Sequence, residues 1–260
     1  MLILENISKQ YGGRTLFKDV NLSFKKGECY GIIGANGAGK STMLNMIAGV
    51  YPVDCGSIVI DGIDVTKLPE HKRAKYIGRV FQDPMNGTAA NMQIIENLAL
   101  ASRRGAHRGL GPGVKHKEKE HYQELLKSLD LGLEDRLTSK VGLLSGGQRQ
   151  AITLLMATMC KPKLLLLDEH TAALDPKTAK KVLDLTEKIV AENNLTTIMI
   201  THNMKDAIAI GNRLIMMNDG KIIYDVEGDE KKALTTADLL AKFKLTSGEE
   251  LDDDKILLSE

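Results

Sequence analysis

The segment Gly34–Ser41 reads GANGAGKS and matches the pattern G-x-x-x-x-G-K-[ST]. The apolar stretch CYGII (29–33) before it predicts a β-strand, and STMLNMIAG (41–49) after it predicts a helix that its terminal glycine can end. The glycines allow successive backbone N–H groups to turn toward one centre. Those donors, the helix N-terminus, the Lys40 ammonium and a magnesium ion held by Ser41 would face the β- and γ-phosphates of a nucleotide. The alternative is a glycine-rich turn that caps a helix without a ligand.

A second stretch, LLLLDEHTAALD (164–175), places two acids after four consecutive leucines. A run without a polar side predicts a parallel strand that is buried on both faces, although a buried helix segment has the same pattern. Unpaired carboxylates are too costly to bury, so Asp168 and Glu169 should lie at the rim of the sheet. In P-loop NTPases an acid at this position holds magnesium opposite the loop hydroxyl, which assigns Asp168 to the metal. Glu169 is then the candidate for polarising an attacking water, unless it is a rim carboxylate that pairs with a lysine.

The rest of the chain predicts an α/β core that is interrupted by helices. Strands are predicted at VNLSF (20–24), YIGRVF (76–81), TTIMIT (196–201), RLIMMN (213–218) and KIIYDV (221–226), and a hairpin at GSIVIDGIDV (56–65) with Asp61 and Gly62 at its tip. Helical spacing appears at Tyr122, Leu125, Leu126 and Leu129, and again at Val182, Leu185, Ile189 and Val190. We therefore predict a domain at 1–226 with a helical sub-domain inserted at about 83–160, and a short helical and acidic extension at 227–260.

Composition limits the class of protein. The 260 residues are 43% hydrophobic and 27% charged, which suits one large domain, or a domain with a sub-domain, around a sizeable core. A formal net charge of +1 argues against nucleic-acid binding through a broad basic surface. The three cysteines lack metal-ligand spacing and predict reduced thiols in a cytosolic protein. No apolar run reaches the ~18 residues that span a bilayer and the N-terminus is too polar for a secretory signal, so we expect a soluble protein that reaches a membrane only through a partner.

The segment LLSGGQRQ (143–150) predicts a second anion site. Ser145, Gly146 and Gly147 stand directly before a helical run, where a hydroxyl and unshielded backbone amides favour negative charge. Taken alone, this pattern is typical of a helix cap. If a nucleotide fills the first site, the second needs a phosphate of its own or must share one with a second copy of the chain.

From about residue 2 to about residue 226 the chain resembles the ABC ATPases, the nucleotide-binding subunits of ATP-binding-cassette transporters. The matching features are GANGAGKST (34–42), Gln82 after IGRVF, LSGGQRQ (144–150), LLLLDE (164–169), AALD (172–175) and His202 in THNM. The resemblance implies the ABC ATPase fold, a P-loop NTPase core with an antiparallel β sub-domain and an inserted α-helical sub-domain. It also implies a head-to-tail homodimer with two ATP molecules at its interface. Ser145 and Gly147 of one copy would contact the γ-phosphate that Lys40 of the other copy holds.

The resemblance also assigns roles to single residues. Tyr11 would stack on adenine, a contact of only ~1–3 kcal/mol, so phosphate contacts should dominate affinity. Gln82 would reach the magnesium and the attacking water and report nucleotide state to a membrane partner, His202 would donate to the γ-phosphate, and Asp175 would organise the dimer seam. Without the resemblance, Tyr11, Gln82 and His202 are an ordinary tyrosine before a turn, a polar strand end and a structural histidine. The implied catalytic residues are Glu169, His202 and Gln82, and the implied magnesium ligands are Ser41, Gln82 and Asp168. The implied ATP-binding residues are Tyr11, Gly34, Asn36, Gly37, Ala38, Gly39, Lys40, Ser41, Thr42, Ser145, Gly146, Gly147, Gln148 and Asp175.

The function that the resemblance implies is ATP hydrolysis that energises a membrane transporter. The stretches QRQAITLLMATM (148–159) and DEHTAALDP (168–176) are similar to a bacterial subset of solute importers, with aromatic amino acids among the candidate solutes. The implied partners are transmembrane permease subunits and a substrate-binding protein, with no nucleic acid, at the cytoplasmic face of the cell membrane. The alternatives are a single-cassette exporter ATPase and a soluble ABC ATPase that acts on DNA or ribosomes. A P-loop kinase or GTPase of another family is disfavoured by LSGGQ.

Two features depart from the family pattern or fall outside it. His170 stands where proline usually follows the glutamate. It is either a harmless local variant or a titratable group near the phosphates that makes turnover sensitive to pH. The basic loop from Arg103 to His116 either faces the membrane subunit or anionic lipid, or is a solvated loop.

Overall fold

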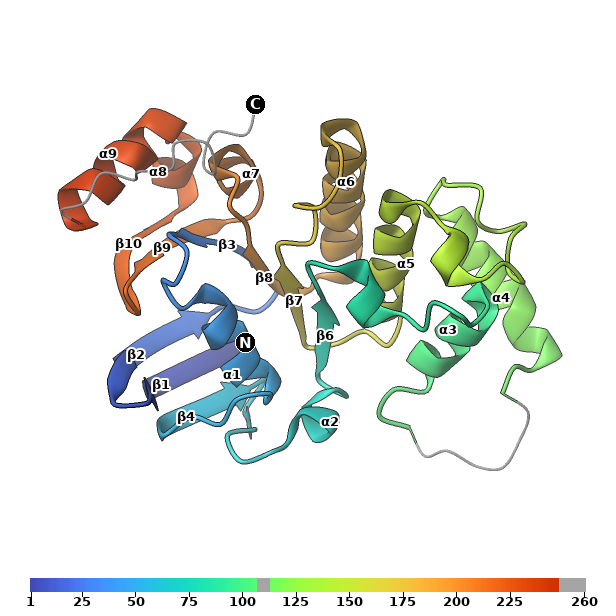
Figure 1. Cartoon of the computed structure of the whole chain (residues 1–260), viewed down its shortest axis with the longest axis horizontal. Coiled ribbons are helices and arrows are strands. Elements are labelled where there is room, and N and C mark those ends of the chain that lie inside the picture. The colour runs from blue at the N-terminus through green and yellow to red at the C-terminus, as the bar shows by residue number, and fades with distance from the viewer. Residues whose placement is uncertain (107–112, 248–260) are drawn as a thin grey trace.

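The computed structural model describes residues 1–106 and 113–247, and builds them into two β-sheets with helices between and around them (Figure 1). The antiparallel sheet has the order β2-β1-β4-β5 and consists of β1 (Leu2–Tyr11), β2 (Arg14–Phe24), β4 (Cys55–Ile60) and β5 (Ile63–Asp64). The larger sheet has the order β10-β9-β3-β8-β7-β6 and consists of β3 (Cys29–Gly34), β6 (Ile77–Val80), β7 (Leu164–Asp168), β8 (Thr196–Ile200), β9 (Arg213–Asn218) and β10 (Lys221–Glu227). Its neighbours are parallel except for β10, which returns antiparallel to β9. The predicted strands and the β4–β5 hairpin are confirmed.

The helices and 3₁₀ turns alternate with these strands along the chain. They are α1 (Lys40–Ala48), α2 (Glu70–Arg73), η1 (Pro84–Gly87), α3 (Ile94–Ser102), α4 (His116–Lys127), η2 (Val141–Leu143), α5 (Gly146–Thr158), α6 (Pro176–Asn193), α7 (Met204–Ala209), α8 (Gly228–Lys232) and α9 (Thr236–Ser247). Among the residues that the structure describes, no helix combines the length and the apolar character that crossing a bilayer requires.

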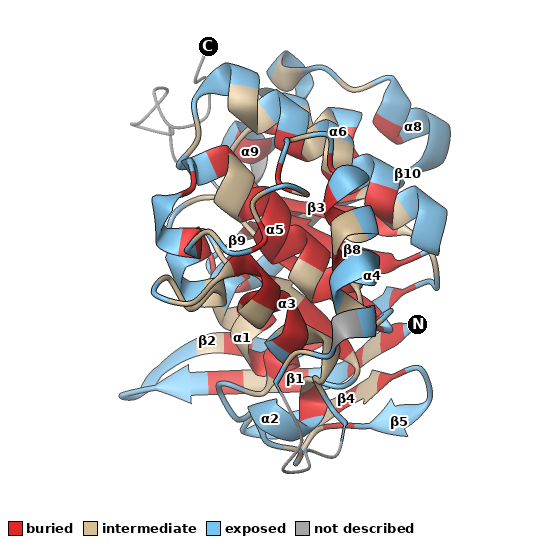
Figure 2. Ribbon diagram, turned by 90° about the vertical axis from the view of Figure 1, so that its right-hand side faces the viewer, coloured by how far each residue is buried: buried red, intermediate tan, exposed pale blue. Residues whose placement is uncertain are grey.

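The run of four leucines is buried on both faces of the larger sheet. Leu164 and Leu166 pack with α1 and the antiparallel sheet, whereas Leu165 and Leu167 pack with α5 and α6 on the opposite face. Successive side chains of a strand point to opposite faces, so a strand covered on both sides has no polar position to spare. The predicted strand at this run is therefore confirmed, and Figure 2 shows the buried residues concentrated in this central layer.

A separate apolar cluster joins α3, α4 and α5, which lie together at one side of the molecule (Figure 1). Tyr122 and Leu126 of α4 pack there against Leu98 of α3 and Ile152 of α5. Helix α5 also contributes to the cluster under β7, so it belongs to both layers. The boundaries 83–160 for an inserted sub-domain stay a prediction.

The C-terminal helix α9 packs onto the larger sheet. Leu239 and Phe243 are buried in a cluster with Met204 of α7 and Met216 of β9. The predicted helix is therefore docked on the core rather than separate from it. The acidic end at 251–260 lies outside the described residues, as do positions 107–112 of the basic loop.

Candidate nucleotide site

The predicted site residues follow the carboxyl ends of parallel strands. The glycine-rich loop follows β3, Gln82 follows β6, Glu169 follows β7 and His202 follows β8. Parallel strands end at the same edge of their sheet, so the topology gathers these segments along one edge. Ligands of open α/β sheets bind at such an edge, and here the residues on neighbouring strands β7 and β8 make direct contacts.

The conformation of the glycine-rich loop requires glycine at two of its positions. A Cβ on Gly34 would lie 2.1 Å from the Met217 carbonyl oxygen, and one on Gly39 would lie 2.7 Å from the Phe17 ring. Gly39 has a φ of +99°, in the left-handed region, and is the N-cap of α1. Asn36 and Gly37 are exposed at the tip, and Ala38 is buried beneath it, where its carbonyl accepts from the Gly220 amide. The loop therefore places the amides at the start of α1 beside an exposed tip.

Lys40 is held inside the loop by backbone carbonyls. Its Nζ donates to Gly34 O at 2.7 Å and to Ala35 O at 3.0 Å, and the residue is 5% exposed. Burial lowers the pKa of the ammonium, while the carboxylates of Glu169 and Asp168 raise it. The Lys40 ammonium therefore lies near two carboxylates, in a position where phosphate oxygens could replace the carbonyls of its own loop as acceptors.

Ser41 and Asp168 meet across α1 and β7. The Ser41 hydroxyl donates to Asp168 Oδ1 at 3.3 Å, and Arg79 Nη2 lies 3.6 Å from Asp168 Oδ2. Burial raises the pKa of Asp168, Arg79 lowers it, and the neighbouring charge of Glu169 raises it again. The structure therefore brings together two of the three predicted magnesium ligands.

Glu169 and His202 form the second close pair of the site. His202 Nε2 lies 2.5 Å from Glu169 Oε1, and their side chains are 24% and 10% exposed, respectively. Glu169 has a φ of +48°, an uncommon conformation for a residue with a Cβ, and its amide donates to Ile200 O at 3.0 Å. The contact pins the turn after β7 to the end of β8. This pairing with a histidine corrects the alternative in which Glu169 pairs with a lysine.

Ser145 and Asp175 both serve as helix N-caps. Ser145 Oγ accepts from Gln148 N at 3.3 Å at the start of α5, and Asp175 Oδ1 accepts from Thr178 N at 3.1 Å at the start of α6. A Cβ on Gly147 would lie 2.1 Å from Thr178 Cγ2, so the two helix starts approach each other closely. Among residues 1–106 and 113–247, no hydrogen bond or ion pair joins Ser145 or Asp175 to Lys40. The predicted second anion site is therefore exposed at Ser145 and Gly146, apart from Lys40 within the described chain.

Tyr11 and Gln82 are exposed. Tyr11 ends β1 with 46% exposure, and its ring meets Tyr51 edge-on at 6.2 Å between centroids. Lys9 Nζ lies 5.1 Å from the centre of the same ring. Gln82 lies in a bend after β6. The contact of Tyr51 with Tyr11 was not predicted, because a tyrosine that follows a helix does not reveal a partner 40 positions away in the sequence.

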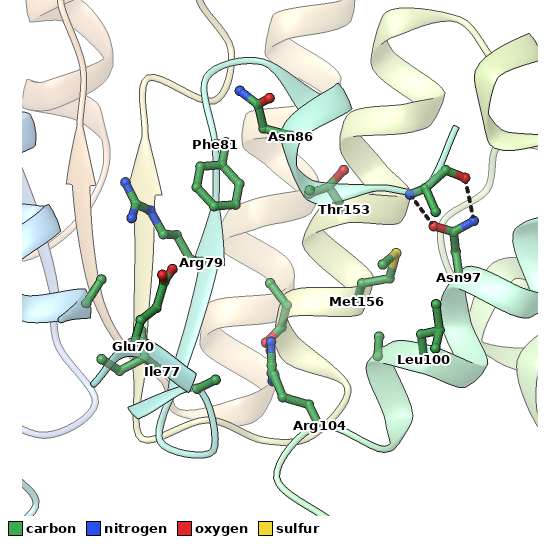
Figure 3. A pocket seen from close by; sticks show the side chains of 16 residues that line it. Glu70, Ile77, Arg79, Phe81, Asn86, Asn97, Leu100, Arg104, Thr153 and Met156 are labelled. Carbon is green, nitrogen blue, oxygen red and sulfur yellow. Dashed lines mark hydrogen bonds between the residues drawn. The ribbon is translucent and has the colours of Figure 1, made fainter. Parts of the chain in front are cut away.

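Arg79 is the other residue that the sequence did not single out. Besides Asp168, its Nη2 contacts Asn45 Oδ1 of α1 at 2.7 Å, and its guanidinium lies 4.6 Å from the centre of the Phe81 ring. Both residues line a pocket of about 410 Å³ between β6 and the helices α3 and α5, which we call the β6–α5 pocket. Figure 3 shows Arg79 and Phe81 on the strand side of this pocket and Leu100, Arg104 and Met156 on its helical side. The signal was present in IGRVF, where the arginine falls near the end of a predicted strand.

His170 does not face the phosphate site as a titrating group. It is 2% exposed, and its Nε2 lies 3.1 Å from Thr186 Oγ1 of α6. Burial lowers its pKa to about 4, so the ring is neutral near pH 7. The hypothesis of a pH-sensitive histidine near the phosphates is therefore wrong for physiological pH.

Comparison with known proteins agrees with this geometry. A family model described as ABC transporter matches residues 17–172. The chain is 45% identical over 249 residues to the tyrosine transport ATP-binding protein of Clostridioides difficile, covering 94% of this chain and 99% of that protein. It is 36% identical over 223 residues to the spermidine/putrescine import ATP-binding protein PotA of Haemophilus influenzae, covering 85% of this chain but only 56% of PotA.

Solved structures give the same family. The dimeric ATP-binding cassette MJ0796, in a post-hydrolysis state with ADP and Pi bound, matches with a TM-score of 0.74 and 32% identity over 87% of this chain and 98% of that one. The ADP conformation of MJ1267, an ATP-binding cassette of an ABC transporter, matches with a TM-score of 0.76 and 28% identity over 89% of this chain and 92% of that one. The chain therefore belongs to the ABC transporter family, as an ATP-hydrolysing cassette that energises transport.

Proposed function

We propose that two copies of this chain clamp two ATP molecules head to tail, hydrolyse them and thereby drive a permease that imports an amino acid. One observation carries the proposal. Two directly contacting pairs, Ser41 with Asp168 and Glu169 with His202, lie at one edge of one sheet, where the charges of Asp168 and Glu169 also act on Lys40. Such an edge offers a cation, a hydroxyl and carboxylates to a single triphosphate.

Magnesium is proposed for the site beside Ser41 and Asp168. The hydroxyl and carboxylate oxygens, 3.3 Å apart, are donors of the kind that Mg²⁺ takes, so these residues fit the ion. Ser41 and Asp168 would hold it, together with Gln82 from the exposed bend after β6. When bound, the ion would offset the charge of the β- and γ-phosphates. Arg79 helps to keep Asp168 ionised for this role, because it lowers the pKa of that carboxyl.

Glu169 is proposed as the general base. It would accept a proton from the water whose oxygen attacks the γ-phosphorus, while the bond from that phosphorus to the ADP oxygen breaks and releases ADP and phosphate. His202, 2.5 Å from the Glu169 carboxylate, would orient that carboxylate and face the γ-phosphate. Lys40 would exchange the carbonyls of Gly34 and Ala35 for phosphate oxygens.

The second copy is proposed to complete the site with the exposed start of its α5. Ser145, Gly146 and Gly147 would present a hydroxyl and helix N-terminal amides to the γ-phosphate bound by the first copy. Asp175, at the neighbouring start of α6, would lie in the seam between the copies. Gln148 and Thr42 would flank the phosphates, and Tyr11, with its exposed ring, would stack on adenine. The exposure of Ser145, Gly146, Asp175 and Tyr11 in the single chain supports the arrangement.

The permease is proposed to contact the β6–α5 pocket at the cytoplasmic face of the membrane. The pocket is lined mostly by apolar and small side chains, and its wall includes Phe81, directly before Gln82. A permease segment seated there would therefore touch the strand end that leads to the nucleotide. Tyrosine or a related amino acid is the proposed solute, delivered by a substrate-binding protein, because the relative with 45% identity is a tyrosine transport protein.

Replacement of the proposed base tests the catalytic assignment. Glu169→Gln should bind ATP within about 3-fold of the parental affinity, because the amide is isosteric, but lose at least ~100-fold in kcat, because general-base catalysis contributes about that much. Steady-state phosphate release and binding of a fluorescent ATP analogue measure the two effects. Glu192→Gln, an exposed position on α6, is the matched control and should keep the parental rate. A Glu169→Gln enzyme that turns over at the parental rate would exclude Glu169 as the base.

The solute assignment has its own test. In proteoliposomes that contain the chain and its permease, tyrosine together with the binding protein should stimulate ATP hydrolysis, whereas spermidine and methionine should not. Stimulation by spermidine alone would refute the amino-acid assignment and leave the ATPase assignment intact.

A further inference from the structure

We propose that Arg79 is a positioning residue that couples occupation of the magnesium site to the wall of the β6–α5 pocket. The inference rests on the proposed function, because it takes Asp168 as a magnesium ligand. It assigns to Arg79 a role that extends beyond the triphosphate site, toward the surface where the permease is proposed to sit.

The Arg79 guanidinium contacts both helix α1 and the end of strand β7. Arg79 Nη2 donates to Asn45 Oδ1 on α1 at 2.7 Å and lies 3.6 Å from Asp168 Oδ2 at the end of β7. The side chains of Arg79 and Asp168 are only 13% and 15% exposed, so water screens their attraction weakly. Arg79 therefore holds Asp168 when no other cation does.

A divalent ion and the Arg79 guanidinium would compete for the Asp168 carboxylate. A divalent ion held by Ser41 and Asp168 would share that carboxylate with a guanidinium that already lies against it. Like charges at such short range in a weakly screened site repel strongly. Metal occupation should therefore weaken the contact between Arg79 and Asp168, and Asn45 would remain as the alternative partner of the guanidinium.

Arg79 is also part of the wall of the β6–α5 pocket. The Arg79 guanidinium lies over the Phe81 ring, and both side chains line the β6–α5 pocket (Figure 3). The carbonyl of Phe81 accepts from Gln150 Nε2 of α5 at 3.3 Å, which fixes the backbone there. Arg79 Nε is buried and has no hydrogen-bond partner among the described residues, so the present position of the guanidinium leaves one of its donors unsatisfied. Movement of the Arg79 guanidinium away from Asp168, with its hydrogen bond to Asn45 retained, would change the stacking on Phe81 and thus the pocket wall.

The magnesium dependence of nucleotide binding tests the competition. Binding of a fluorescent ATP analogue to the full chain is measured at pH 8 as Mg²⁺ is raised from zero. Arg79→Met should lower the Mg²⁺ midpoint about 10-fold, because it removes a competing cation, and should leave metal-free binding within about 3-fold. Arg79→Lys, which keeps a cation, should lie closer to the parental midpoint.

Arg104→Met is the matched control. Arg104 lines the same pocket and also has a buried Nε without a partner, but its guanidinium donates to Ala157 O, and among the described residues no contact joins it to Asp168. Its variant should keep the parental midpoint. An Arg79→Met midpoint that equals the parental one, or a shift of the same size in Arg104→Met, would overturn the proposal. Failure of the parental chain to bind nucleotide at any Mg²⁺ concentration would instead refute the proposed function and this inference with it.

A tryptophan reporter tests the link to the pocket. The chain has no tryptophan, so Phe81→Trp introduces a single fluorophore under the guanidinium. With the non-hydrolysable analogue AMP-PNP bound, addition of Mg²⁺ should change the emission of Phe81→Trp, and Arg79→Lys in the same background should reduce that change at least 2-fold. An equal Mg²⁺-dependent change with and without Arg79 would contradict the coupling. This second measurement also decides the question if Arg79→Met fails to fold.

Discussion

At the scale of single residues, the buried side chain of His170 anchors the segment that follows β7. Its ring is 2% exposed and lies 3.1 Å from Thr186 Oγ1. Because the Thr186 hydroxyl donates to Val182 O, it accepts from the histidine, which assigns the ring proton to Nε2. A proline fixes the chain through its own ring, whereas His170 fixes the segment between Glu169 and Asp175 by a side-chain contact with α6.

The burial of His170 predicts how stability depends on pH. Its pKa falls from 6.5 to about 4 on folding, so the neutral ring contributes stability that is complete above pH 6.5 and is lost as pH falls from 6.5 through about 4. The loss is up to about 3 kcal/mol. Chemical denaturation at several pH values measures it against His170→Gln, which keeps a donor near Thr186 but does not titrate. The parental protein should lose more stability than the variant over this window, and parallel curves would contradict the assignment.

The positions of residues in local motifs were predictable, and contacts between residues far apart in the sequence were not. Lys40, Asp168 and Glu169 were found because the order of strand, loop and helix places them. Arg79 was missed because its importance comes from Asn45, Asp168 and Phe81, which packing alone brings to it. The sequence likewise left open whether His170 is a harmless variant or a titratable group near the phosphates, because its contact with Thr186 lies 16 positions away.

At the scale of elements, helix α1 of the phosphate loop is closed at its far end by a buried arginine. Arg73 Nη1 donates to Met46 O and Ile47 O at 2.8 Å each, at the carboxyl end of the helix. Its Nε and Nη2 donate to the carbonyls of Leu68 and Thr66, and the residue is 2% exposed. Burial lowers the pKa of the guanidinium, which nonetheless stays protonated. A cation here gives Met46 O a second donor besides the Gly49 amide, gives Ile47 O a donor, and interacts favourably with the negative end of the helix dipole.

Arg73→Lys should therefore destabilise the fold although it conserves the charge. The ammonium cannot reproduce the planar fork that reaches four carbonyls, and buried carbonyls left unpaired are expensive. We expect a loss of about 2–4 kcal/mol in the free energy of unfolding, measured by urea denaturation. Lys72→Arg, at an exposed neighbouring position, is the control and should change it by less than about 0.5 kcal/mol. Equal stability of Arg73→Lys and the parental protein would show that the carbonyls find other partners.

Elements were predicted wherever an apolar pattern reflected burial. The run Leu164–Leu167 and the alternation in β2 gave strands, and the glycine at 49 correctly ended α1, where its φ is +85°. What covers each face was not predictable in detail. Helix α9 docks because Leu239 and Phe243 pack against α7 and β9. This packing joins segments that are separated in the sequence, and a local pattern does not reveal such contacts.

At the scale of the whole molecule, our proposal divides the nucleotide site between two separate surfaces of the chain. The sheet edge with Lys40, Asp168 and Glu169 is the proposed site of the triphosphate, and the start of α5 at Ser145 is the proposed second set of donors. Motif order led to both predictions. The two motifs left open whether the second surface binds its own phosphate or shares one with a second copy, and the family resemblance favours sharing.

Sedimentation velocity of Glu169→Gln tests this union most directly. With saturating ATP and Mg²⁺, the variant should sediment as a dimer, because unhydrolysed nucleotide holds the copies together, and it should return to a monomer when EDTA removes the metal. Adding Ser145→Arg, which places a bulky side chain at the shared phosphate, should abolish the dimer without preventing ATP binding. Only monomers of Glu169→Gln at saturating ATP and Mg²⁺, or a dimer that persists unchanged with Ser145→Arg, would contradict the clamp.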